Sequence, residues 1–163
     1  MKDPIKEQIL LENSLHFIRV TAVTDPEEEK RLDKEYEEYT GSFLDESDKC
    51  GIAGLETDKK EVLMFLFIHQ WKVERIISFI QEHNLLAEHK IVDDPVRFFC
   101  SDKELFEAYN NADNRDILDV FIRSQINVDY VLDRYNENRN VPGFTLLPVE
   151  MEVFQRDAKG FAA

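Results

Sequence analysis

Two histidines, His16 and His69, are the residues of this chain whose side chains and positions could bind a metal ion or transfer a proton. His16 lies in a segment rich in β-branched and aromatic residues, and His69 directly follows the apolar run from Val62 to Ile68. If these segments are neighbouring antiparallel strands, the start of one lies beside the end of the other, so the two imidazoles can approach at one edge of the sheet. Two imidazoles near a carboxylate can hold a metal ion or transfer a proton. We therefore consider a ligand or metal site at His16, His69 and Trp71; the alternative is a pair of ordinary, partly buried histidines on different faces.

The sequence otherwise lacks the patterns that enzymes use. It has no nucleophile-elbow motif, no glycine-rich phosphate loop and no His-Glu-x-x-His zinc motif. Its cysteines, Cys50 and Cys100, are far apart and carry no flanking motif of a catalytic thiol. The oxygen-rich segment 111–116 lacks the glycine and the glutamate of a calcium loop, so helix capping explains it better. We expect a protein without catalytic activity, with no cofactor and no assigned metal.

Acidic side chains dominate the charge. The chain carries 34 acidic and 20 basic residues, a formal net charge of −14. Such a charge repels phosphate backbones and anionic lipids, so we expect neither a nucleic-acid partner nor a membrane. One acidic segment is a candidate docking face for a basic protein, because acidic side chains raise the rate of association with it; its residues are Glu27, Glu28, Glu35 and Glu38. The alternative is an ordinary solvated helix face, whose first-turn acids stabilise the helix itself.

Hydrophobic periodicity predicts the elements that must position these residues. Segments 14–23, 50–57, 61–69 and 85–92 are predicted strands, and segments 25–41 and 71–83 are predicted helices. Asp25 followed by Pro26 is a helix-start signal. The resulting β-α-β-β-α-β order predicts an α+β fold, a ferredoxin-like antiparallel sheet with two helices on one face. Residues 42–49 are expected to form an exposed loop.

The rest of the chain is predicted to be mainly helical. We expect an α+β region at residues 1–92 and a helical C-terminal extension at residues 93–163, packed on the first region as one compact unit. Helix-capping residues near positions 101, 113 and 127 predict three helices. Apolar residues at 149, 151 and 153 alternate with glutamates, which predicts an edge strand after Pro148, with a last helix as the alternative. Large apolar side chains are expected on both faces of the sheet, so the C-terminal helices or a second copy of the chain must cover the second face.

These features favour a small acidic cytoplasmic protein that binds another protein. The first residues, Met-Lys-Asp-Pro, do not resemble a secretory leader, and no apolar stretch is long enough to cross a membrane. We predict an interaction or regulatory module that docks a basic partner through its acidic surface. The alternatives are a small-molecule- or metal-binding protein or enzyme with a site at the sheet edge near His16 and His69, and a structural homo-oligomer.

Overall fold

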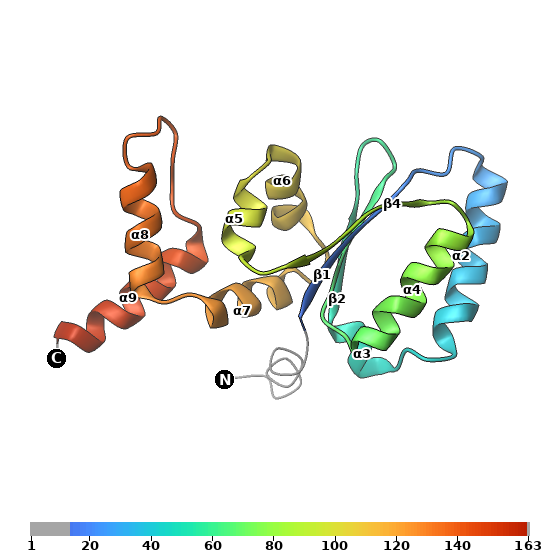
Figure 1. Ribbon diagram of the computed structural model, residues 1–163, viewed down its shortest axis with the longest axis horizontal. Helices are drawn as coiled ribbons and strands as arrows, with labels where there is room; N and C mark the ends of the chain where they lie inside the picture. The colour runs from blue at the N-terminus through green and yellow to red at the C-terminus, as the bar shows by residue number, and fades with distance from the viewer. Residues whose placement is uncertain (1–13, 163) are drawn as a thin grey trace. The chain divides into compact units, whose positions relative to one another are not determined.

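A computed structural model describes residues 14–162, with side chains described as far as residue 156. These residues form a mixed α/β structure with one four-stranded antiparallel sheet and eight helices (Figure 1). The chain divides into two compact units: the first ends at Ile117 and the second begins at Leu118.

The sheet belongs to the first unit and contains all four strands expected from the sequence. Their order is β2-β3-β1-β4, and every neighbouring pair is antiparallel. Phe17 of β1 lies opposite Phe65 of β3 on one side and opposite Lys90 of β4 on the other. The strands are β1 (Leu15–Val20), β2 (Ile52–Glu56), β3 (Val62–Leu66) and β4 (Leu86–Val92).

Helices α2 (Pro26–Gly41) and α4 (Gln70–Glu82) cover one face of the sheet (Figure 1). Asp25 caps α2 by accepting a hydrogen bond from the backbone N–H of Glu27 at 3.1 Å, and Pro26 fixes the first turn. The predicted apolar stripe of α4 is buried, and its members Val73 and Ile76 pack with Ile18 of β1. Each fully buried aliphatic side chain of this kind contributes about 1.5–3 kcal/mol through removal from water.

The opposite face is covered by α5 (Pro95–Cys100) and α6 (Lys103–Asn111), so the chain itself seals the second apolar surface. The ring of Phe17 meets Phe98 edge-on at 5.2 Å, and Phe65 meets Phe99 at 5.3 Å. Phe99 in turn stacks on Tyr109 of α6 at 5.0 Å. Both helices follow residue 92 in sequence, yet they lie in the same compact unit as the sheet.

Residues 42–49 are not the exposed loop that we expected. They include most of a short helix, α3 (Glu46–Cys50), which begins with a capping box between Asp45 and Asp48. Asp48 is buried and forms an ion pair with Lys72 of α4. The prediction was wrong because a single helical turn has no periodicity, and because a buried aspartate cannot be recognised without its partner.

Helices dominate the second unit. Helix α7 (Arg115–Gln125) crosses the boundary between the units, and α8 (Val128–Asn138) begins at the predicted cap Asn127, which accepts from the N–H of Tyr130 at 3.0 Å. The edge strand predicted after Pro148 is wrong, because this segment is helix α9 (Pro148–Ala162). Val149 and Val153 are buried one turn apart, as a helix requires, and Glu150 is also buried rather than facing solvent. None of the described helices has the length and apolar character needed to cross a membrane.

Candidate functional site

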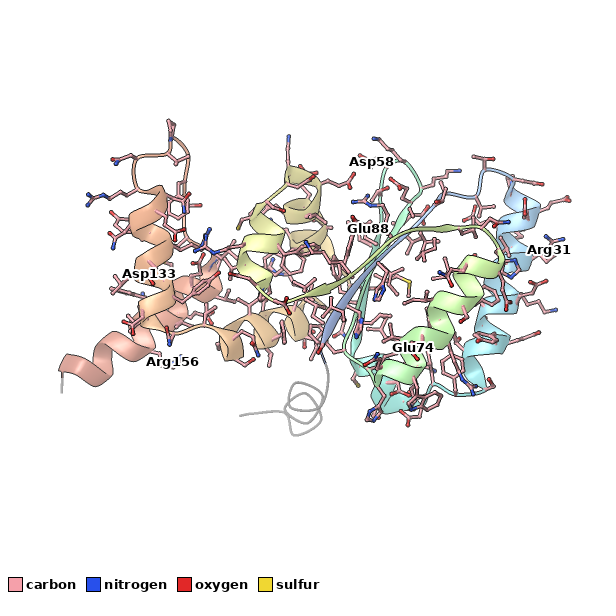
Figure 2. The ribbon with its side chains drawn as sticks, in the orientation of Figure 1. Arg31, Asp58, Glu74, Glu88, Asp133 and Arg156 are labelled. Atoms are coloured by element: carbon pink, nitrogen blue, oxygen red, sulfur yellow. The ribbon has the colours of Figure 1, made fainter. Side chains whose placement is uncertain are left out.

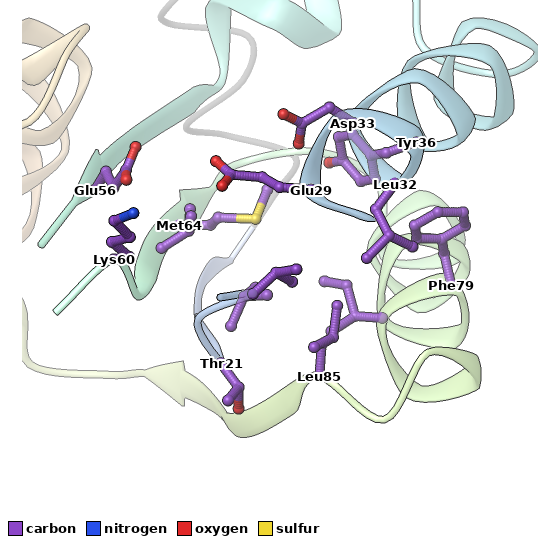
Figure 3. A pocket seen from close by; sticks show the side chains of 14 residues that line it. Thr21, Glu29, Leu32, Asp33, Tyr36, Glu56, Lys60, Met64, Phe79 and Leu85 are labelled. Atoms are coloured by element: carbon purple, nitrogen blue, oxygen red, sulfur yellow. The ribbon is translucent and has the colours of Figure 1, made fainter. Parts of the chain in front are cut away.

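A half-open pocket of about 280 Å³ lies within the first unit, where the end of β1 passes beneath α2 and α4 (Figure 3). Val20 of β1 and Met64 of β3 form its floor on the sheet side. Leu32 and Tyr36 enter from α2, and Phe79 enters from α4. Most of its wall is therefore apolar, which is the usual character of a ligand site in proteins.

Charged side chains surround this apolar interior. Glu29 and Asp33 lie one turn apart on α2, beside the buried Leu32, and their carboxylates face the pocket (Figure 3). Glu56 at the end of β2 and Lys60 in the turn before β3 complete the rim. Within the described part of the chain, none of these four side chains is in an ion pair. The rim thus presents three carboxylates and one ammonium, an excess of negative charge.

Tyr36 is the polar group nearest to the apolar wall. Its ring packs edge-on against Phe79 at 5.5 Å. Burial raises the pKa of Tyr36 to about 12, because the charged phenolate is disfavoured away from water. The hydroxyl therefore stays protonated at neutral pH and can both donate and accept a hydrogen bond.

A second feature on the same side of the sheet is a pair of imidazoles. Nδ1 of His16 lies 3.1 Å from Nε2 of His89, and the two rings stack with their centroids 5.3 Å apart. Burial lowers the pKa of His16 and the neighbouring His89 lowers it further, whereas Glu74 of α4 acts in the opposite direction (Figure 2). A hydrogen bond between two ring nitrogens needs one donor and one acceptor, so one of these two rings donates and the other accepts.

The residues grouped from the sequence lie in different places. His16 is buried in β1, and its ring partner is His89 rather than His69. His69 occupies the exposed N-cap position of α4. Trp71 is 48% exposed in the first turn of that helix, where the guanidinium of Arg75 lies 5.2 Å from its ring centre. Among residues 14–156, no three His, Cys, Asp or Glu side chains are arranged to hold a metal ion.

The pairing of His16 with His89 had a signal in the sequence, but a weak one. His89 lies in a predicted strand, and a β1–β4 register that places it opposite Ile18 brings it diagonally beside His16. That register is continuous from Leu15 to Arg19 and shifts only between Arg19 and Val20, and no local pattern in the sequence predicts it.

The four glutamates of the predicted docking face are all exposed on α2. Arg31, on the same helix, lies 3.8 Å from Glu28 and 4.0 Å from Glu35 (Figure 2). Such exposed pairs contribute about 1 kcal/mol at most, but they neutralise part of the charge. Glu27 and Glu38 have no such ion pair within the described residues, so the uncompensated charge of this face is at these two positions.

Comparison of the chain with protein-family models, with curated proteins and with solved structures finds no match. Any proposal for the function must therefore rest on the geometry of the sites. The pocket combines an apolar interior, a protonated phenol and an acidic rim, a set of groups that suits the binding of a ligand.

Proposed function

We propose that this protein is a non-catalytic interaction module that docks a basic protein through the acidic face of α2. The observation that carries the proposal is that Glu27 and Glu38 are exposed and form no ion pair among the described residues. These two positions are about three helical turns apart and therefore lie on the same side of α2. A basic partner that spans this face would encounter unpaired carboxylates at both ends, which favours electrostatically steered association.

Two broader proposals accompany this function. We assign the first unit to the ferredoxin-like class, supported by the strand order β2-β3-β1-β4 and by α2 and α4, which link β1 to β2 and β3 to β4. We place the protein in the cytoplasm, supported by the free thiol of Cys50.

The test compares partner capture by the natural chain and by a variant with a neutral docking face. This variant carries Glu27→Gln, Glu28→Gln, Glu35→Gln and Glu38→Gln. A matched control removes as many exposed carboxylates elsewhere, through Asp58→Asn, Glu82→Gln, Glu107→Gln and Asp133→Asn. Both variants have the same net charge, so a difference between them reports the position of the charge rather than its amount.

We expect native lysate to yield a basic partner that the natural chain and the control retain and the docking-face variant loses. Retention should weaken between about 50 mM and 300 mM salt, because exposed charges are screened over a shorter distance at higher ionic strength. Failure to recover a partner at either salt concentration would count against the proposal. Equal loss of the partner from both variants would show that only the total charge matters.

A further inference from the structure

We propose that the pocket beneath α2 and α4 binds a small organic cation, an apolar chain or ring that ends in an ammonium group. This site is separate from the docking face, because Glu29 and Asp33 border the buried stripe of α2 whereas Glu27 and Glu38 lie on its outer side. The inference therefore does not depend on the proposed protein partner.

The interior of the pocket accounts for the apolar part of the ligand. Aliphatic side chains line it from the strands, the flexible thioether of Met64 forms part of its floor, and the ring of Phe79 closes one side. A thioether adapts to ligands of irregular shape. The volume of about 280 Å³ lies near the lower end of the range for small-molecule sites, which suits a short chain or a single ring.

The rim accounts for the charged end of the ligand. Glu29, Asp33 and Glu56 place negative charge at the mouth, and Lys60 offsets only part of it. An ammonium seated between the carboxylates of α2 gains Coulomb attraction while its chain leaves water, whereas an anion of the same shape is repelled. The faces of the Tyr36 and Phe79 rings favour a cation for the same electrostatic reason.

The Tyr36 hydroxyl adds a directional contact. It remains protonated at neutral pH, so its oxygen can accept a hydrogen bond from an ammonium N–H. No hydrogen bond of this hydroxyl is made within the described residues, so a ligand that bonds to it displaces no protein contact.

Three probes of one chain length test the charge requirement: hexylamine, 1-hexanol and hexanoate. Each is titrated into the isotopically labelled full chain near pH 7, and amide and methyl resonances are followed by NMR. We expect hexylamine to shift resonances of Val20, Met64 and Leu85 with a dissociation constant at least about tenfold lower than that of hexanol, a difference of about 1.4 kcal/mol. Hexanoate should bind more weakly than hexanol.

Variants of the rim separate charge from shape. The double variant Glu29→Gln/Asp33→Asn should reduce the preference for hexylamine over hexanol by about fivefold or more and leave hexanol binding unchanged. The matched control Glu37→Gln/Glu82→Gln removes two exposed carboxylates outside the pocket and should keep the preference. Filling the pocket by Met64→Trp should weaken both probes, with circular dichroism used to check that the variant remains folded.

Several outcomes would overturn the inference. Equal affinity for hexylamine and hexanol would show that the rim does not select charge. Shifts confined to residues outside the pocket would indicate diffuse attraction of the amine to an acidic protein. Binding of a lysine-rich peptide at the pocket, with no effect of hexylamine there, would make this surface part of a protein-docking site instead.

Discussion

The ammonium of Lys72 in α4 and the carboxylate of Asp48 in α3 form an ion pair whose side chains are only 9% and 8% exposed. The same carboxylate oxygen, Oδ2, accepts a hydrogen bond from the backbone N–H of Asp45 at 2.9 Å. One oxygen thus caps the short helix α3 and ties it to α4. A buried carboxylate in this position depends on its cation, because removing one partner leaves an uncompensated charge.

The first prediction concerns this ion pair. Lys72→Met should lower the free energy of unfolding by about 3–5 kcal/mol, because Asp48 remains buried without a cation. The control Lys49→Met removes an ammonium that is 65% exposed and 3.4 Å from Glu46, and it should cost less than about 1 kcal/mol. Urea denaturation of both variants measures the difference. Similar losses for the two variants would show that the buried pair contributes no more than a surface one.

The second prediction concerns Arg134 of α8 and Glu150 of α9. Nε and Nη2 of Arg134 donate to the two carboxylate oxygens of Glu150 at 2.9 and 2.7 Å, and Glu150 is fully buried. Arg134→Met should destabilise the second unit by about 3–5 kcal/mol, since the carboxylate loses its partner. The double variant Arg134→Met/Glu150→Leu should recover much of that loss, because no buried charge remains.

Thermal and urea unfolding of the two single variants and the double variant provide a complete double-mutant cycle. If the double variant loses as much free energy of unfolding as the two single variants lose in sum, the ion pair is not the dominant interaction between α8 and α9.

The third prediction is a pH dependence that comes from His16. Burial and the neighbouring His89 lower the pKa of His16 in the folded chain, and Glu74 acts in the opposite direction. A histidine in the unfolded chain has a pKa of about 6.5. Between these two values the unfolded state binds more protons, so stability is highest above about pH 6.5 and falls as the pH decreases toward the lowered pKa. Denaturation between pH 7.5 and 5 should show this loss, and His16→Gln should reduce it.

The variant His69→Gln is the control for loss of one histidine, and NMR titration of the His16 ring protons gives its pKa directly. A His16 pKa at or above 6.5 would contradict this prediction.

The fourth prediction concerns Gly51, between α3 and β2. A Cβ atom at this position would lie 2.5 Å from the backbone carbonyl oxygen of Phe67, whose N–H donates to the Gly51 carbonyl at 2.7 Å. Gly51→Ala should therefore cost about 1–3 kcal/mol, since the backbone cannot move away without losing this hydrogen bond. Gly41→Ala, where a Cβ meets nothing within 4 Å, should be neutral or stabilising by up to about 1 kcal/mol. Thermal unfolding of the two variants tests the contrast, and equal melting temperatures would refute it.

Local sequence patterns were sufficient to predict most of the elements. Asp25 and Pro26 start α2 because a cap and a fixed φ act within one helical turn. The apolar run after Glu61 forms β3, and the segment that follows it, with apolar residues every three to four positions, forms α4. Each pattern directly reflects which side chains must be buried. The expectation that both faces of the sheet need a cover also follows from counting large apolar side chains, and α5 and α6 provide the second cover.

Interactions between distant residues decided the rest. The alternation of apolar residues and glutamates at 149–153 is compatible with a strand. In the structure, however, Glu150 pairs with Arg134, and this pair requires a helix that buries Glu150. The contact between His16 and His89 depends on the register of β1 and β4, and the pocket depends on side chains that α2, α4 and the sheet bring together. The sequence by itself determined most of the elements, because local patterns act over a few residues. Only the tertiary structure determined α3, α9, the ion pairs and the pocket, because their energies arise from groups far apart in the chain.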